Sequence, residues 1–213
     1  MKSTTRFAAI ASLATTLIGS FITLAPAFGA TLTPKTPVTK APAPSVVTPP
    51  KAPVLFGQKE VDQNKFIAIS VPIARGKSQN LMILEQVSNQ RACWKETGNK
   101  PTTVDPLLLK FNFTGICGRA TDSNGYSIRV AGKDLGMQYT LSLQKVNGDM
   151  VLVGTNRRNP FAQPLVIGHT GGITDGIMKI NLEPGWRMTK RTYNGQTLGH
   201  IYFTNDSSEL AKL

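Results

Sequence analysis

The stretch FNFTGICGRATDSNGYSIRV, residues 111–130, decides the fold that the sequence predicts. It places Cys117 between two glycines and continues into a polar run at residues 122–125, with alternating apolar segments on either side. Alternation of apolar and polar residues is typical of a strand with one buried face. The stretch therefore predicts two strands joined by a compact turn region that a covalent bond holds in place.

The polar run is interpreted as a turn rather than as a metal site. Asp122, Asn124 and nearby Asp134 carry oxygens that suit Ca²⁺, but the further carboxylates of a calcium-binding loop are missing. Asn and Gly are also the residues that accept a positive φ most readily. We therefore expect a plain turn, with positive φ at Asn124 and Gly125.

Cys117 has one partner available, because Cys93 is the only other cysteine in the 213 residues. In an exported chain such a pair is most simply a disulfide, which would stabilise the fold by on the order of 3 kcal/mol. A reactive thiol or a metal ligand is the alternative. His169 and His200, the only histidines, give no zinc-type spacing with these cysteines. The sequence predicts a disulfide, no metal site and no cofactor.

The rest of the domain shows the same strand periodicity. Residues 107–114 alternate most regularly, with Leu107, Leu109, Phe111 and Phe113 on one side. Asn-Gly pairs at residues 147–148 and 194–195 predict hairpins. The run LMIL at residues 81–84 suggests a central strand buried on both faces, although a short helix fits it as well.

These segments predict an all-β fold, a single antiparallel β-sandwich or barrel-like domain over residues 54–206. Eight to eleven short strands are expected, with one disulfide and a C-terminal tail at residues 207–213.

Two segments precede this domain. Residues 1–27 carry Lys2 and Arg6, an apolar stretch and an A-x-A cleavage pattern, which is typical of a signal peptide. An uncleaved membrane anchor is the alternative, and it is the only route to the membrane that the sequence offers. Residues 28–53 hold seven prolines and little bulky apolar content, which predicts a disordered Pro-rich linker, either a spacer or an unstructured leftover.

Three segments carry a family resemblance: FGQKEVDQNKFIAISVP at residues 56–72, RACW at residues 91–94, and PGWRMTKRTYNGQTLGHIYFT at residues 184–204. Together with the opening stretch they resemble a family of secreted cyanobacterial proteins catalogued only as a domain of unknown function, over about residues 54–204. The resemblance implies export and a small domain, and it supplies no catalytic residues.

The charge suggests an anionic partner. The chain carries a net charge of +12, and removing residues 1–53 leaves a domain of +7. Such a charge favours acidic polysaccharide, lipid headgroups or nucleic acid through long-range attraction, but it also simply keeps a protein soluble. Nucleic acid does not suit an exported protein, so we expect an anionic polysaccharide or another cell-envelope component.

The expected ligand-facing residues lie near the C-terminal end. Strand alternation over residues 186–193 puts Arg187, Arg191 and Tyr193 on one side, where they can stack on sugars and pair with anions. An ordinary solvent-facing strand fits the same pattern. Other candidates are the loop arginines and two residues of the next strand, namely Arg157, Arg158, His200 and Tyr202.

The sequence contains no motif that declares a reaction. We expect a non-enzymatic cell-envelope or extracellular-matrix protein that is secreted, periplasmic or at the cell surface. The alternative is an exported hydrolase acting on envelope polymers, with groups such as Ser207, His200 and Asp206 assembled by folding. An assembly subunit is a third interpretation.

Overall fold

The computed structural model describes residues 56–210 of the chain. The predicted signal peptide (1–27) and Pro-rich linker (28–53) lie outside the described residues. Within this part, no helix is long and apolar enough to span a membrane.

Strands dominate the described chain, and its helices are three 3-10 turns: η1 (Gln63–Lys65), η2 (Ala74–Gly76) and η3 (Leu107–Lys110). The strands are β1 (Phe56–Glu60), β2 (Phe66–Ile73), β3 (Ser78–Gln86), β4 (Lys95–Thr97), β5 (Thr103–Asp105), β6 (Cys117–Ala120), β7 (Tyr126–Val130), β8 (Lys133–Asp134), β9 (Tyr139–Val146), β10 (Asp149–Asn156), β11 (Leu165–His169), β12 (Met178–Leu182), β13 (Arg187–Tyr193) and β14 (Gln196–Asn205).

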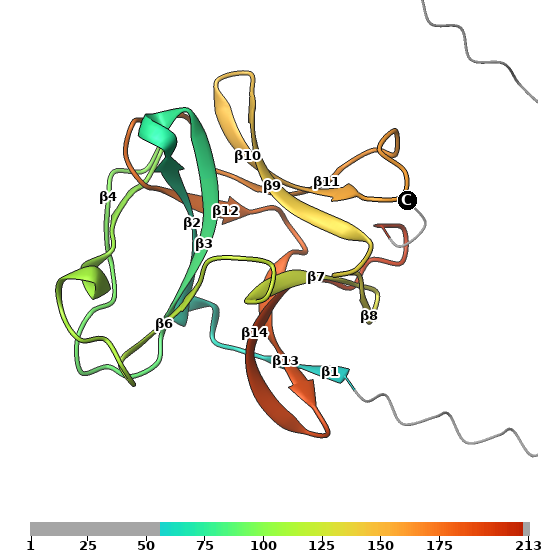
Figure 1. Ribbon diagram of the computed structural model, residues 1–213, viewed down its shortest axis with the longest axis horizontal. Helices are drawn as coiled ribbons and strands as arrows, with labels where there is room; N and C mark the ends of the chain where they lie inside the picture. The colour runs from blue at the N-terminus through green and yellow to red at the C-terminus, as the bar shows by residue number, and fades with distance from the viewer. Residues whose placement is uncertain (1–55, 211–213) are drawn as a thin grey trace, which may run out of the picture. The chain divides into compact units, whose positions relative to one another are not determined.

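The strands form two sheets, so the predicted all-β fold is confirmed. One sheet has the order β1-β13-β14-β7-β8, and the other runs β6-β3-β2-β12-β11-β10-β9 with β4 and β5 attached beside β12. In Figure 1, β9, β10 and β11 lie above the core while β1, β13 and β14 lie below it. The larger sheet curls, since β9 also approaches β3 and β7. The strand number exceeds the expected eight to eleven because four short strands, namely the edge strands β1, β4 and β8 and the strand β5 between β4 and β12, have no sequence signal of their own.

One pairing departs from the predicted antiparallel arrangement. β14 lies parallel to β7, with Ile201 opposite Tyr126 and Tyr202 opposite Ser127, whereas the other strand pairs are antiparallel. This parallel pair joins segments more than 70 residues apart in the sequence. It also decides which side chains meet on the outside of the smaller sheet.

The main core lies between the two sheets. β2 and β3 are buried on both faces, as the sequence predicted for residues 81–84: Ala68 and Ile83 face the main core, while Ile69 and Leu84 face a second apolar cluster. Tyr126, Ile128 and Val130 fill the main core from β7.

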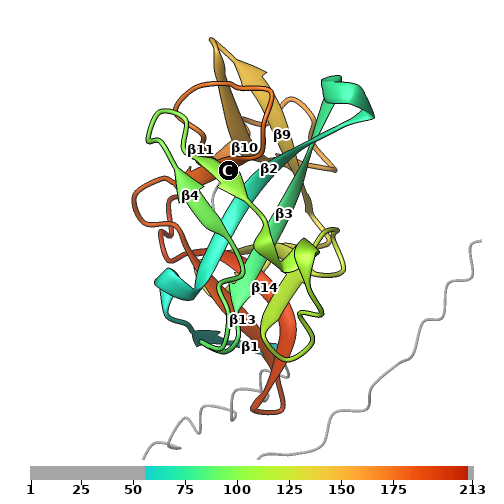
Figure 2. The same ribbon diagram turned by 90° about the vertical axis from the view of Figure 1, so that its left-hand side faces the viewer.

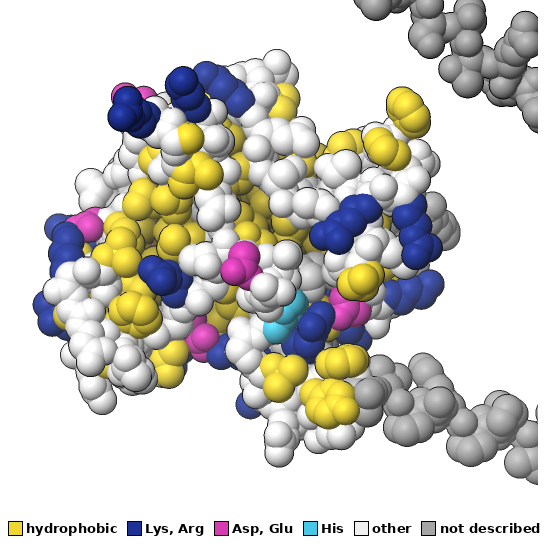
Figure 3. All heavy atoms as spheres, in the orientation of Figure 1, with side chains coloured by type: hydrophobic (Ala, Val, Ile, Leu, Met, Phe, Trp, Pro, Cys, Tyr) yellow, Lys and Arg dark blue, Asp and Glu magenta, His cyan; other side chains and the backbone are white. Residues whose placement is uncertain are grey.

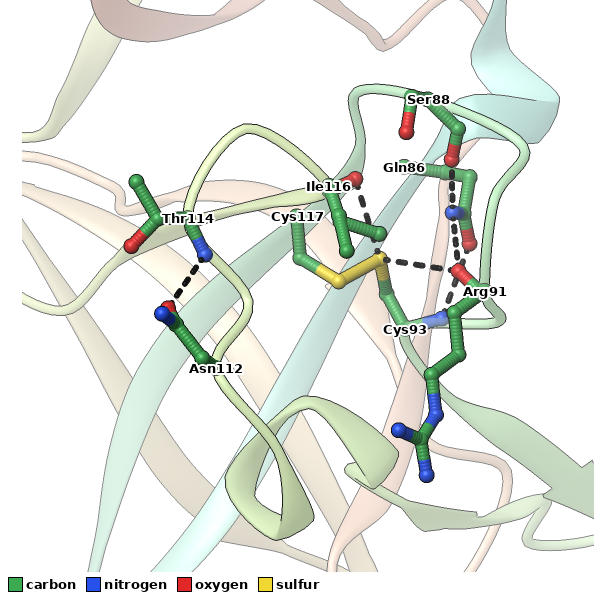
Figure 4. The surroundings of a disulfide bond; sticks show 8 residues. All are labelled: Gln86, Ser88, Arg91, Cys93, Asn112, Thr114, Ile116 and Cys117. Atoms are coloured by element: carbon green, nitrogen blue, oxygen red, sulfur yellow. Dashed lines mark hydrogen bonds between the residues drawn. A yellow bond between two sulfur atoms is a disulfide. The ribbon is translucent and has the colours of Figure 1, made fainter.

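The second cluster is covered by the segment at residues 87–117, which lies over β2 and β3 (Figure 2). Its centre is the predicted disulfide, Cys93–Cys117, with a Cα–Cα distance of 5.8 Å. The Gln86 amide fixes the loop before Cys93, because it accepts the Cys93 N–H and donates to the Arg91 carbonyl (Figure 4). Arg91 then places its guanidinium 4.1 Å from the centre of the Phe111 ring.

The prediction of a strand over residues 107–114 is wrong. The segment begins with η3, in which Leu108 is fully buried while Leu109 is 59% exposed. The Leu108 N–H donates to the Cys93 carbonyl at 3.0 Å, so this backbone is bonded to the loop around the disulfide rather than to a neighbouring strand. Of the four alternating residues, Phe111 and Phe113 pack against the second cluster; the buried residue of the turn is Leu108, from the other side of the expected strand.

The stretch at residues 111–130 does contain two strands, β6 and β7, but they belong to different sheets. The turn between them is confirmed, with the Gly125 N–H donating to the Asp122 carbonyl at 2.9 Å. The expected positive φ is wrong, because neither Asn124 nor Gly125 adopts one. Glycine is required here for space: a Cβ on Gly125 would lie 2.8 Å from the Ala120 Cβ.

Both Asn-Gly hairpins are confirmed. Asn147 and Gly148 join β9 to β10 with positive φ angles of 49° and 79°, and Asn194 and Gly195 join β13 to β14 with 47° and 78°. Hairpins of this kind need little beyond their own turn residues, because Asn and Gly tolerate the left-handed backbone.

Candidate functional site

The predicted ligand-facing residues lie mostly on the side of the smaller sheet that faces away from the core. We call this side the polar sheet face; it carries Arg129 from β7, Arg187 and Arg191 from β13, and His200 and Tyr202 from β14. Their neighbours in sequence, such as Met188, Ile201 and Phe203, point into the core. Strand alternation therefore placed these residues on the correct side of the sheet.

Arg191 and Tyr202 share one carboxylate, Asp134 of β8. Arg191 donates through Nε to the Tyr202 hydroxyl at 2.5 Å and through a terminal nitrogen to Asp134 Oδ2 at 2.6 Å. The Tyr202 hydroxyl donates to the same oxygen at 2.7 Å. Partial burial would raise the pKa of Asp134, but hydrogen bonds from the Gly136 amide, Tyr202 and Arg191 lower it below its ordinary value. The charge of Arg191 is thus neutralised within the chain.

Arg187 lies at the other end of β13 and is neutralised in the same way. It donates to both oxygens of Glu60, at 2.8 and 2.9 Å, and its terminal nitrogen lies 2.9 Å from Asp206 Oδ2. The hydrogen bond from Arg187 is the largest influence on Glu60 and lowers its pKa. The structure therefore separates Arg187 from the group formed by Arg191, Tyr202 and His200.

Tyr193 lies at the edge of the polar sheet face and packs at a tilt against Phe56 of β1. The ring centres are 5.1 Å apart, and the side chains remain 39% and 41% exposed. The pairing of β1 with β13 sets Phe56 directly opposite Tyr193. This exposed aromatic pair adjoins Arg191, whose guanidinium lies 5.4 Å from the Phe56 ring centre.

His200 is bonded on both ring nitrogens, although neither partner was predicted. Nε2 lies 2.8 Å from the Ser127 hydroxyl, and Nδ1 lies 2.8 Å from the Asn124 carbonyl oxygen. Burial lowers the pKa of His200, and the charge of Arg191 adds to this; the Asn124 carbonyl and Asp134 act in the opposite direction. Asp206 and Ser207 do not join His200, because Asp206 pairs with Arg187.

Ser127 borders two pockets. The larger, about 510 Å³, is lined by residues that include Phe56, Met137, Arg191 and His200. The smaller, about 300 Å³, includes Tyr139, Thr140 and Arg157. Both pockets are lined by Ser123, Ser127 and Gly136.

The two predicted loop arginines are separate from the polar sheet face. Arg157 donates to the Thr140 hydroxyl at 2.7 Å and lines the smaller pocket, whereas Arg158 is exposed. Among the described residues, neither of them forms an ion pair within 4.0 Å.

A third pocket, larger than these two, lies elsewhere and was not predicted. It measures about 650 Å³ and lies between the β2–β3 turn and the β9–β10 hairpin. Its lining includes three exposed cations, Arg75, Lys77 and Lys145, for which no ion pair within 4.0 Å is found in the described part of the chain. We call this pocket the basic cleft. Lys and Arg side chains gather over these elements at the top of Figure 3.

The second histidine, His169, lies on β11 between two carboxylates. Nδ1 is 3.0 Å from Asp149 and Nε2 is 3.7 Å from Glu183. Because the carboxylates contact opposite ring nitrogens, they do not converge on one point where an ion could bind. Residues 56–210 contain no group of three His, Cys, Asp or Glu side chains suited to a metal ion.

Three comparisons with known proteins bear on identity. No curated protein matches the chain, and no solved structure matches it. A family model described as "Protein of unknown function (DUF3747)" matches residues 36–208, which covers the described domain almost completely. The chain therefore belongs to the DUF3747 family.

Proposed function

We propose that this protein is an exported cell-envelope or extracellular-matrix protein that binds anionic polysaccharide, and that the basic cleft is its principal contact. The observation that carries the proposal is the set of three exposed cations, Arg75, Lys77 and Lys145, around one cleft without ion-pair partners in the described chain. The disulfide is consistent with an oxidising compartment, where such bonds persist.

The charge balance supports the basic cleft over the polar sheet face. The sequence predicted Arg187 and Arg191 as ligand contacts. Both form ion pairs with carboxylates of their own chain. A polysaccharide would have to compete with these ion pairs. In the cleft the lining contains one carboxylate, Asp175, against three cations. An incoming anion there gains attraction without first breaking an existing pair.

The lining also suits a sugar. Leu143 and Met150 are among the lining residues and provide apolar surface, which can pack against the C–H faces of a pyranose ring. The cations supply hydrogen-bond donors for carboxylate or sulfate groups. The turn that carries Arg75 holds Ala74 and Arg75 at positive φ, 51° and 57°, a backbone that non-glycine residues seldom adopt and that recurs at ligand-binding positions.

The test measures binding of the oxidised full-length chain to immobilised alginate, with neutral dextran as the ligand control. We expect retention on alginate that falls as salt rises, and none on dextran. Replacing Arg75, Lys77 and Lys145 by Gln should weaken binding about 10-fold or more, since three exposed ion pairs contribute up to about 1 kcal/mol each.

A matched variant separates the site from the overall charge. Lys59, Lys65 and Lys95 are also exposed and lie outside the cleft, so replacing them by Gln removes the same charge. This control should change binding by about twofold or less. Salt-independent retention, or an equal loss in both triple variants, would contradict the proposal.

The polar sheet face is tested in parallel. An Arg187→Ala/Arg191→Ala variant should reduce alginate binding less than the cleft variant does, because its guanidinium groups are already paired. A larger loss in this variant, with the fold retained, would move the binding site to the polar sheet face.

A further inference from the structure

Ser127 and His200 form a hydrogen-bonded pair whose chemistry goes beyond binding. The Ser127 hydroxyl lies 2.8 Å from Nε2, and Nδ1 lies 2.8 Å from the Asn124 carbonyl oxygen. A carbonyl oxygen only accepts hydrogen bonds, so Nδ1 must carry a proton. In the neutral ring Nε2 then has a free lone pair, and the Ser127 hydroxyl donates to it.

This arrangement is the one that a nucleophile and its general base require. The base is within hydrogen-bond reach of the hydroxyl proton, and a third group, the Asn124 carbonyl, holds the ring in the correct tautomer. The environment favours the neutral imidazole, because burial and the charge of Arg191 lower the pKa of His200. The groups that act on the ring are Arg191, Asp134, the edge of Tyr202 and the Asn124 carbonyl.

The other histidine lacks these features. Both ring nitrogens of His169 face carboxylates, and the neighbouring Thr170 hydroxyl donates to Asp149 rather than to the ring. The Ser127–His200 pair is thus the place in the described chain where a histidine holds a hydroxyl.

Ser127 is 8% exposed, and the surface that it does present lines two pockets. Ser127 and Gly136 line both the 510 Å³ pocket and the 300 Å³ pocket, so Ser127 lies between the two cavities. Gly136 leaves this junction open, because a Cβ there would lie 3.2 Å from the Ser127 Oγ. A bond attacked by Ser127 could therefore place one of its halves in each pocket.

The two linings differ in chemistry. The larger pocket includes exposed Phe56 and Met137, which suit a small acyl group. The smaller includes Asn80, Thr140 and Arg157, which suit a hydroxylated alcohol.

We propose that Ser127 is a nucleophile and His200 its general base, in a site that hydrolyses short-chain carboxylic esters of hydroxylated alcohols. Oγ attacks the ester carbonyl carbon while its proton passes to Nε2. The C–O bond to the alcohol breaks, and the alcohol leaves with that proton. Water then attacks acyl-Ser127, gives a proton to Nε2, and releases the carboxylic acid as the proton returns to Oγ. Arg191 lines the same pocket, and its charge favours the neutral form of His200 there.

The experiment uses the oxidised full-length chain with two probes: a fluorophosphonate, which labels activated serines, and peracetylated glucose, whose hydrolysis releases acetate. Labelling should fall on the peptide that contains Ser127 and disappear in Ser127→Ala. His200→Gln should slow labelling and acetate release about 100-fold or more, the range for loss of a general base. Ser207→Ala is the matched control, since Ser207 is exposed and lines neither pocket, and it should retain more than half of the rate.

Two further readouts keep the proposal testable if Ser127→Ala unfolds. The labelling rate should rise with pH to a plateau with a midpoint below 6.5, because His200 must be neutral and its pKa is lowered. Ser127→Cys introduces a thiol into a chain without free cysteines, and its alkylation by iodoacetamide should be at least 10-fold faster than in Ser127→Cys/His200→Gln.

The assignment would be overturned if the folded chain were not labelled, or if labelling persisted in Ser127→Ala. It would also be overturned if alkylation of Ser127→Cys were equally fast with and without His200. The basic cleft does not take part in this chemistry, so the cleft variant should label at the wild-type rate. Failure of polysaccharide binding and failure of ester hydrolysis can thus be told apart.

Discussion

The polar sheet face and the basic cleft hold the same number of cations and differ in their counter-charges. On the sheet face, Glu60, Asp134 and Asp206 lie within 4.0 Å of Arg187 or Arg191. The cleft has three cations and one carboxylate, with no ion pair between them in the described chain. The number of cations on a surface therefore does not show whether that surface can bind an anion, because carboxylates of the same chain can already neutralise them.

The two regions are also built differently. The sheet face rests on β7, β13 and β14, where hydroxyls such as Thr189 and Thr204 are fully buried and bonded to each other at 2.8 Å. The cleft is formed by a turn and a hairpin whose charged side chains are exposed. We therefore expect changes on the sheet face to affect stability, and changes in the cleft to affect binding.

The largest effect on stability should follow from Asp134→Asn. The substitution removes the charge shared by Arg191 and fully buried Tyr202, and it leaves a guanidinium without its carboxylate. We expect the free energy of unfolding to fall by about 2 kcal/mol, measured by urea denaturation. Asp175→Asn, in the cleft, is the control and should change it by less than about 0.5 kcal/mol. Equal losses would show that the two regions do not differ in this respect.

A smaller effect should appear in the pH dependence of the same pair of proteins. Because the pKa of Asp134 is lower in the folded chain than in the unfolded one, its stabilisation is present above about pH 3.8 and is lost as pH falls through the folded value. The difference in stability between wild type and Asp134→Asn should therefore narrow below pH 3.8. Asp149, whose pKa is lowered to about 2, contributes equally to both proteins and cancels. A gap that stays constant down to pH 2 would contradict the assigned role of Asp134.

The sequence could predict those parts of the fold that depend on local chemistry. The Asn-Gly hairpins at residues 147–148 and 194–195 need only their turn residues and flanking alternation, and both formed as expected. The buried run at residues 81–84 followed from its unbroken apolar character. The disulfide followed from a count of two cysteines.

The parts that failed depend on contacts distant in the sequence. Residues 107–114 alternate like a strand, yet residues 107–110 form a 3-10 turn whose Leu108 N–H donates to the Cys93 carbonyl. Periodicity shows which side chains are apolar, but it does not show which backbone groups form hydrogen bonds with the segment.

The candidate sites show the same limit. Alternation placed Arg191, His200 and Tyr202 on one face, but Ser127 is 73 positions from His200 and joins it only through the parallel pairing of β7 with β14. The basic cleft depends on the β2–β3 turn approaching the β9–β10 hairpin, which no local pattern encodes. Likewise, the carboxylates that neutralise Arg187 come from β1 and from the residue after β14.

The smallest expected change in stability is that of the cleft variant, and it distinguishes the basic cleft most sharply from the polar sheet face. Replacing Arg75, Lys77 and Lys145 by Gln should leave the free energy of unfolding within about 0.5 kcal/mol of wild type, as for exposed residues without specific partners. The same protein should bind alginate at least 10-fold more weakly, so binding and stability are affected independently. Urea denaturation and alginate retention, measured on one preparation, check both statements. A loss of more than about 1 kcal/mol would mean that these cations stabilise the fold, and the contrast with the sheet face would then fail because both sets of charges would serve the folded chain.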